Sequence, residues 1–420
     1  MRNSKLAKFG FVAIASFLML IVPGRLWAGE EIGKDVMQES GTSTLDTGNF
    51  SRSSLRYSVS VRGGYDDNVN TSSVFEQESA FVSIGGTLAY NFGSPRTQLS
   101  LTTGGGYTYY LSDILGGENY DANIYLALSA THKATPRLTF AASVYASYQT
   151  QPDFDLNVAL NRRSGNFFYT SDKFSMSYLW TPRFSTVTSY TLGVVKYEDA
   201  DVADFEDRFE NTLGNEFRFL VLPTTSLIAE YRIMFINYDN NGLRDSISNF
   251  ALVGIDHSFS PRFNISLRGG AEFRDYDNAV LNQNTNVTDP YFEGTLIYAV
   301  GKRTSISWTN RYGLEEPDVA LAQRRTTFRT GLSVRHDFTS RISTNLAFYY
   351  EHDHNDEFFD AFTFSPSFND DVFDLVLSVR YAISRNFAVE GGYNFTDFES
   401  ELPLRSYTRN RVWGGLNFSF

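Results

Sequence analysis

The sequence predicts an all-β protein, a transmembrane antiparallel up-and-down β-barrel of about eighteen strands. From residue 53 onward, apolar and polar side chains alternate with a period of two, which indicates strands with one apolar face. Short turns recur at intervals of roughly 40 residues. After residue 28, no apolar run reaches the roughly 18 residues that a membrane-spanning helix needs. Such a chain can cross a membrane only as a closed barrel, because an open sheet leaves backbone groups unpaired in lipid.

The first 28 residues have the features of a secretory signal peptide. Basic residues at positions 2, 5 and 8 precede an apolar run over 11–22, and a small residue, Ala28, stands at the expected cleavage site. An uncleaved membrane anchor is the alternative. Residues 29–52 are polar and lack alternation, so we expect a flexible periplasmic extension there, with a partner-docking segment as the alternative. The barrel is then expected to occupy residues 53–420.

Composition and charge exclude several classes of function. The chain contains no Cys, which excludes a thiolate nucleophile, cysteine-bound zinc and a disulfide framework. Its formal net charge is −12 at pH 7. Removal of residues 1–28 would take away four of the 36 basic residues and none of the 48 acidic ones, which gives −16. A chain this acidic is a poor general binder of nucleic acid, so no nucleic-acid partner is expected.

Each repeat of the chain consists of a strand, a long polar loop, a second strand and a short turn. In the first strand, Leu55 and Val61 fall on one face and Arg56 and Arg62 on the other. Eight short turns and nine long loops predict eighteen strands, with both chain ends on the short-turn side. Propeller blades also repeat at this interval, but they need four short strands per repeat. The turns are expected at 93–96, 134–137, 180–183, 222–225, 259–262, 300–303, 338–341 and 382–385.

The last strand ends in an aromatic residue, Phe420, with Phe418 two positions before it. This ending resembles the signal by which barrel-assembly machinery recognises its clients. Together with the strand pattern, it predicts a cell outer membrane location in a Gram-negative bacterium. Outer-membrane lipid and lipopolysaccharide are therefore expected to surround the barrel.

A Tyr-Asp-Asn motif recurs where strands enter long loops, at Tyr65, Tyr197, Tyr238 and Tyr276. A catalytic motif has no reason to repeat, whereas a structural device does. We expect each Tyr to lie at the outer lipid boundary, because its amphipathic ring suits the headgroup level. The neighbouring acids are expected to end the strand and face the outside medium. Cation bridging between these acids and lipopolysaccharide is the alternative.

Motifs for catalysis, cofactors or metals are not found in the sequence. The only candidate for a metal site is His352-Asp353-His354, which alternates across a strand edge and is better interpreted as part of a solvated loop. We therefore expect no enzymatic activity, no cofactor and no bound metal.

The polar face of the strands is expected to line the lumen. Aromatic residues on that face, among them Tyr125, Tyr145, Tyr349 and Trp413, could stack on sugar rings, and loops 278–289 and 353–370 could narrow the mouth. An arginine stripe would attract anionic or hydroxyl-rich solutes. The alternative is that these charges pair across neighbouring strands. The arginines predicted to contact a substrate are Arg56, Arg62, Arg268, Arg274, Arg311, Arg325, Arg329, Arg335, Arg409 and Arg411.

The strand pattern, the opening strand that runs into Gly64-Tyr65-Asp66-Asp67-Asn68, and the terminal aromatic strand resemble a known family. It is the putative beta-barrel porin family found beside bacterial exopolysaccharide operons. The resemblance covers essentially the whole chain after the signal peptide. It implies an outer-membrane barrel that passes a secreted polysaccharide and works with a periplasmic polysaccharide-export protein. It supplies no fixed binding residues.

The sequence thus predicts a pore that translocates exopolysaccharide across the outer membrane. Two alternatives stay open. One is a general diffusion porin for small hydrophilic solutes, and the other is a closed surface or structural barrel.

Overall fold

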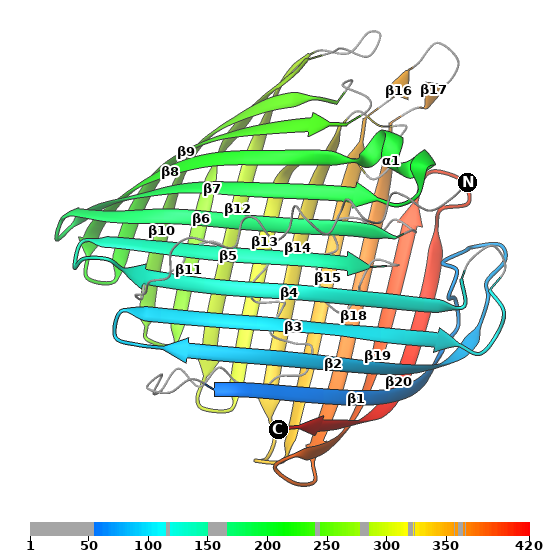
Figure 1. Ribbon diagram of the computed structural model, residues 1–420. Coiled ribbons are helices and arrows are strands. Elements are labelled where there is room, and N and C mark those ends of the chain that lie inside the picture. Colours follow the sequence, from blue (N-terminus) through cyan, green and yellow to red (C-terminus); the bar gives the residue numbers. More distant parts are fainter. Residues whose placement is uncertain are drawn as a thin grey trace, which may run out of the picture.

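A computed structural model describes residues 54–114, 118–149, 166–239, 244–277, 285–317, 322, 324–356, 358–359, 364–365 and 367–420. The predicted signal peptide and periplasmic extension lie outside these residues. Eighteen of the described strands form one closed antiparallel sheet (Figure 1). The first strand pairs with the second and also with the last, which closes the barrel. The predicted fold class is confirmed.

The barrel strands are 12 to 15 residues long, enough to cross a membrane at the usual tilt. In chain order they are β1 (Ser54–Asp66), β2 (Ser79–Gly93), β3 (Thr97–Tyr110), β4 (Tyr120–Lys133), β5 (Leu138–Gln149), β6 (Phe167–Thr181), β7 (Phe184–Tyr197), β8 (Arg208–Leu222), β9 (Thr225–Tyr238), β10 (Ser246–Ser260), β11 (Phe263–Tyr276), β12 (Asn286–Val300), β13 (Thr304–Glu315), β14 (Arg325–Asp337), β15 (Ile342–Asn355), β18 (Phe368–Ala382), β19 (Phe387–Ser400) and β20 (Tyr407–Ser419).

All eight short turns occur where the sequence predicted them, at one end of the barrel. The tight turn between β6 and β7, for example, leaves only two residues between Thr181 and Phe184. The long loops lie at the other end. One carries the helix α1 (Ala200–Glu206), and another carries the hairpin of β16 (Phe358–Phe359) and β17 (Phe364–Ser365), which stands beyond the sheet edge (Figure 1). Within the described residues, no helix has the length and apolar character needed to span a membrane.

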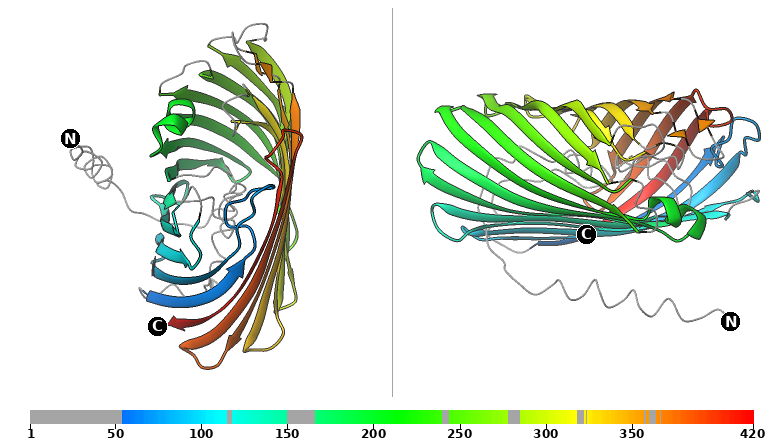
Figure 2. Two further views of the ribbon diagram at one scale, coloured as in Figure 1. Left: turned by 90° about the vertical axis from the view of Figure 1, so that its right-hand side faces the viewer. Right: turned by 90° about the horizontal axis from the view of Figure 1, so that it is seen from above.

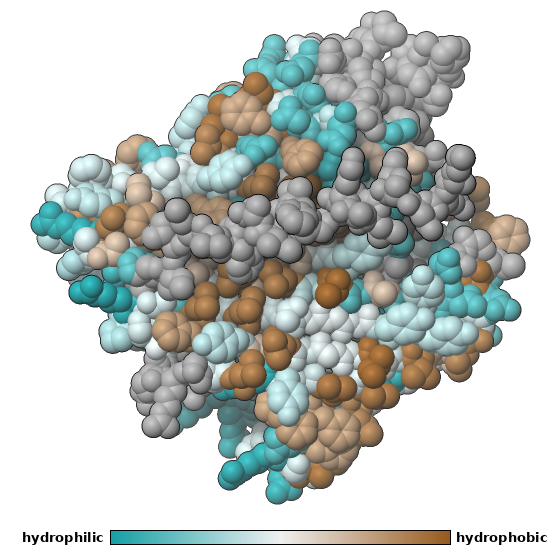
Figure 3. Space-filling view, viewed as in Figure 1, coloured by the Kyte–Doolittle hydropathy of each residue, from teal (hydrophilic) through white to brown (hydrophobic). Residues whose placement is uncertain are grey.

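The two faces of the sheet differ as the alternation predicts. In β1, Val59 and Val61 are more than 40% exposed, whereas Asp66 is fully buried. In a single-layer barrel, a side chain without exposure must lie on the inner side, because nothing covers the outer side. The apolar face therefore points outward to lipid and the polar face inward. Figure 3 shows apolar residues gathered over the middle of the outer face, with hydrophilic residues at the turn and loop margins.

The barrel is flattened, so that two broad walls face each other (Figure 2). Strands β2–β7 form one wall, and β12–β15 with β18 and β19 lie behind it (Figure 1). Large inward side chains lie over glycines of the neighbouring strand. An added Cβ at Gly104 would come within 2.8 Å of the Tyr125 ring, and one at Gly392 within 2.5 Å of the Trp413 ring. These glycines let the rings lie against the wall.

Candidate functional site

Strand registers place all ten predicted arginines on the interior face of the barrel. They do not stand as a free stripe. Among the described residues, most of the interior charges lie in four groups of paired arginines and carboxylates, on strands β8–β15 and at the seam where β20 meets β1.

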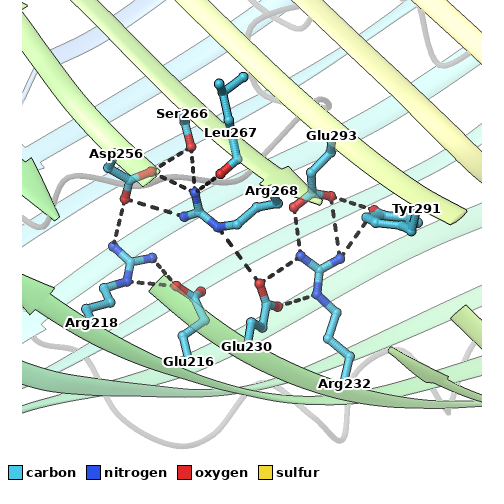
Figure 4. Close-up of polar contacts among 10 residues, drawn as sticks. All are labelled: Glu216, Arg218, Glu230, Arg232, Asp256, Ser266, Leu267, Arg268, Tyr291 and Glu293. Carbon is cyan, nitrogen blue, oxygen red and sulfur yellow. Dashed lines mark hydrogen bonds and ion pairs between the residues drawn. The ribbon is translucent and has the colours of Figure 1, made fainter. Parts of the chain in front are cut away.

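The first group, here the mid-barrel cluster, connects the five neighbouring strands β8–β12 near the middle of their length, and its contacts are drawn in Figure 4. Arg268 of β11 donates to Asp256 of β10 at 2.8 Å. Arg232 of β9 donates to Glu293 of β12 at 2.7 Å, and it also pairs with Glu230 of its own strand. Each cation thus has carboxylates on two sides. The cluster consists of Glu216, Arg218, Glu230, Arg232, Asp256, Arg268, Tyr291 and Glu293.

The second group, here the mouth cluster, lies at the loop end of β8–β13. Arg274 is buried and donates to Glu316 at 2.6 Å and to Glu272 at 2.9 Å. Burial alone would raise the pKa of Glu316, but the guanidinium groups of Arg274 and Arg208 lower that pKa below its ordinary value. The carboxylate is therefore ionised at neutral pH. The cluster consists of Glu206, Arg208, Tyr238, Arg244, Glu272, Arg274 and Glu316.

The third group lies on β13–β15. Arg329 donates to Glu351 at 2.5 Å and also pairs with Glu315 at 3.2 Å. Arg325 pairs with Glu315 and, at 3.2 Å, with Asp353. Since Glu315 serves both arginines, the three strands are tied together by shared charges. Arg311 joins the same group through Glu315.

The fourth group closes the barrel seam. Both oxygens of Asp66 in β1 accept from Arg409 of β20, with the shortest distance at 2.6 Å. Neither side chain is more than 5% exposed. Arg411 lies over the Phe81 ring at 4.3 Å, and Arg62, which pairs with Glu390, lies over a tryptophan ring in the same way.

Eight of the ten predicted arginines therefore form ion pairs, the alternative that the sequence left open. They are Arg62, Arg268, Arg274, Arg311, Arg325, Arg329, Arg409 and Arg411. Arg56 and Arg335 occupy interior positions opposite Ala89 and Asn345. Contact of any of the ten with a substrate stays a prediction.

The sequence analysis missed several acidic partners, above all Asp66, Asp256 and Glu316. A local signal exists for some pairs. Residues two apart on a strand share a face, and Glu-x-Arg occurs at 216–218, 230–232 and 272–274, each time as an ion pair. Partners on other strands leave no such signal.

The prediction for the recurring tyrosines is correct in orientation only for Tyr65, which is 41% exposed. Tyr197, Tyr238 and Tyr276 are buried on the interior face, so the expected position at the outer lipid boundary is wrong for them. A tyrosine at the end of a strand can face either lipid or lumen. Its face is set by the alternation of side chains along that strand, and this alternation is shifted by one residue between β1 and the other three strands.

The expected exposure of the acids in the motif is also wrong for Asp66, which is buried in the seam. Asp67 accepts the backbone N–H of Asn410 at 2.6 Å. Asn68 is buried too, and its amide donates to the carbonyl oxygens of Ser72 and Thr408. The motif fastens the first loop to the last strand.

The opposite wall has a different chemistry. On the interior face of β2–β7, the charged side chains within the described residues are Asp121, Lys133 and Lys173. Hydroxyl, glycine and alanine residues fill most other positions, and we name this surface the hydroxyl wall. Its hydroxyl residues are Ser79, Ser83, Thr87, Ser100, Thr102, Thr108, Ser129, Thr131, Thr139, Ser143, Ser147, Ser171, Ser175, Ser177, Ser185, Ser189 and Thr191.

The inward aromatic residues are divided between the walls. Tyr125 and Tyr145 belong to the hydroxyl wall, and Tyr145 is buried beside Tyr169. Tyr349 and Trp413 lie on the charged side. Stacking of these rings on sugars stays a prediction.

Among the described residues, no three side chains of the kinds that bind metals are grouped to hold an ion. His352 and Asp353 point to opposite faces: His352 contacts Asp371 and Asp353 pairs inward with Arg325. Of the two loops predicted to narrow the mouth, residues 278–284, 357, 360–363 and 366 lie outside the described residues. A narrowing role for these loops stays a prediction.

Comparison with known proteins gives a family and several structural likenesses. The family model described as "Putative beta-barrel porin 2" matches residues 45–420. The outer membrane protein opdK from Pseudomonas aeruginosa is 11% identical with a TM-score of 0.43, over 87% of this chain and 99% of that one. OccAB4 from Acinetobacter baumannii is 10% identical with a TM-score of 0.42, over 88% and 100%. A BenF-like porin from Pseudomonas fluorescens Pf-5 is 8% identical with a TM-score of 0.45, over 88% and 99%. No curated protein matches the chain.

Proposed function

Because the chain belongs to the beta-barrel porin 2 family, we propose that it is a passive diffusion channel for small, hydrophilic, mostly neutral solutes. The protein is an outer-membrane β-barrel porin. A closed barrel of eighteen strands is wide enough to enclose an aqueous channel, and its inward face is polar.

The observation that carries the proposal is the compensation of charge inside the barrel. Each arginine of the mid-barrel cluster has a carboxylate within 4 Å, so the wall presents ion pairs instead of a basic surface. A paired guanidinium attracts a passing anion far less than a free one, because the carboxylate cancels most of its field. The charge pairing therefore removes the main reason to expect a polyanionic polysaccharide as the substrate, which was a stripe of free arginines.

The hydroxyl wall supports neutral, hydroxyl-bearing solutes. Ser and Thr hydroxyls donate and accept hydrogen bonds, so they can replace the water around a sugar or polyol without charge. Exopolysaccharide translocation with a periplasmic polysaccharide-export partner stays a prediction. It would require the lumen of this barrel to admit a hydrated polymer chain.

A swelling assay on proteoliposomes that contain the full-length protein tests the proposal. We expect swelling rates to fall with solute size across arabinose, glucose and raffinose. Gluconate, which resembles glucose in size but is anionic, should give no faster entry than glucose. Proteoliposomes that exclude arabinose, or that prefer gluconate, would overturn the proposal.

A further inference from the structure

The outer face of β6–β10 carries polar side chains in the part of the barrel that faces lipid. We name this surface the polar band. Its residues share the outward face with Phe174, Leu213 and Val253, which are 50%, 49% and 69% exposed. The band consists of Thr170, Asp172, Thr188, Tyr190, Asn211, Asn215, Tyr231 and Asn249.

Several of these residues lie at mid-membrane depth. Asp172 is the sixth of 15 residues in β6, Tyr190 the seventh of 14 in β7, and Asn215 the eighth of 15 in β8. Polar and ionisable groups that face hydrocarbon are unfavourable at this depth. At comparable depth on β2, the outward side chains include Ile84 and Leu88.

The hydrogen bonds of the band have a consistent direction. Asn211 accepts from Tyr190 at 2.7 Å, and Asn249 accepts from Tyr231 at 2.6 Å. Asn215 likewise accepts from a threonine hydroxyl at 3.0 Å. Each amide oxygen is thus used within the barrel wall, and the amide N–H groups remain to donate outward.

The other end of the band offers an acceptor. The Asp172 carboxylate accepts from the Thr170 hydroxyl at 3.0 Å. Its cross-strand neighbours are Val144 and Leu192, which bring no basic group to it. Donor groups on β8–β10 and an acceptor on β6 therefore occupy opposite ends of one surface.

We propose that the polar band is the contact surface between copies of this chain in the membrane. Asp172 of one copy would accept from the amide groups of Asn215 and Asn249 on the next. Because every copy inserts with the same orientation, such a head-to-tail contact relates the copies by a rotation about the membrane normal, and it forms a ring when that rotation closes.

Small residues favour the close approach that this contact needs. Ala251 stands directly opposite Tyr231, and Ala229 stands opposite Val253. Both alanines share the outward face of the band. Asn310 also accepts from Thr330 on the outward face of β13 and β14. The outward carboxylate of that region, Asp371, already accepts from Tyr350 and contacts His352.

Disulfide crosslinking tests the contact, because the chain contains no native Cys. We expect full-length protein with both Phe174→Cys and Ala251→Cys, two outward positions that leave the hydrogen-bonding groups of the band intact, to form crosslinked oligomers in membranes under mild oxidation. The matched control pairs Leu88→Cys on β2 with Ala251→Cys and should stay monomeric. Retained heat-modifiable migration on gels identifies the variants that fold.

A second measurement tests whether the Asp172 carboxylate and the Asn215 amide hold the copies together. The mass of the detergent-extracted protein should be that of an oligomer for the wild type and for Asn310→Leu. It should fall to that of a monomer for folded protein with Asp172→Leu and Asn215→Leu together. A monomeric mass for the wild type would overturn the proposal. So would a folded double-Cys variant that forms no crosslinked oligomers or crosslinks only to other proteins, or equal crosslinking by the control.

Discussion

Asp66 and Arg409 form the contact with the largest expected effect of any single pair. Their two-point ion pair lies at the seam, where the first and last strands must find each other. Removal of one partner from a buried pair leaves the other charge uncompensated, which costs about 3–5 kcal/mol.

We therefore expect Asp66→Ala to lower the unfolding temperature of the barrel markedly, followed as loss of heat-modifiable migration. Joint replacement by Asp66→Leu and Arg409→Leu removes both charges and should be milder. A double variant as unstable as the single one would show that packing at the seam, and not the charge pair, is what matters.

Glu316 predicts a pH dependence at the loop end. The pKa of this carboxyl is lowered in the folded protein, so its contribution to stability is present above the unfolded pKa and is lost as pH falls through the folded value. The unfolded pKa of a Glu is about 4.3.

The unfolding temperature of Glu316→Gln should therefore lie below that of the wild type by a constant amount from about pH 8 to pH 5. The difference should shrink at more acidic pH. A difference that is the same at pH 3 as at pH 7 would contradict the assigned ion pair with Arg274.

At the scale of the strand, the alternation of residues determines which face of the sheet each side chain occupies. Glycines on a neighbouring strand determine whether a large inward side chain can lie flat against the wall. Gly104 on β3 is opposite Tyr125 on β4, and the ring occupies the space that a Cβ would need. Gly104 thus leaves room for the Tyr125 ring to lie against the barrel wall.

We expect Gly104→Val to turn the Tyr125 ring into the lumen and to lower single-channel conductance in planar bilayers. Gly86→Val is the matched control, because Gly86 faces outward on β2 with its nearest atom 3.8 Å from an added Cβ. Equal conductance in Gly104→Val, Gly86→Val and the wild type would show that the ring does not reach the passage.

At the scale of the whole molecule, the two walls of the flattened barrel carry different chemistry. One wall has paired charges from β8 to β15 and the other is rich in hydroxyls, so neither presents a large net field. The reversal potential of the wild type in a KCl gradient should consequently lie near zero.

Glu293→Gln removes one negative charge from the mid-barrel cluster and releases Arg232 from its partner at 2.7 Å. The reversal potential should then shift toward anion selectivity. Glu78→Gln is the control, since Glu78 accepts from Tyr65 on the outer side of the sheet. A wild type with strong anion selectivity would contradict charge compensation in the lumen.

The sequence by itself determined the strands, the eight turns and the inward position of the arginines. These features are local, since a period of two and a Pro- or Ser-containing turn are visible within ten or fifteen residues. Glu-x-Arg pairs such as Glu230 and Arg232 belong to the same class, because both residues stand on one strand.

Only the tertiary structure decided which carboxylate each remaining arginine meets. Asp66 and Arg409 are 343 positions apart, and their contact depends on the register in which β20 closes against β1. The same holds for Arg274 with Glu316 and for the face of the recurring tyrosines. A shift of one residue in register or alternation exchanges interior and lipid faces, so these contacts exist only once the whole barrel has closed.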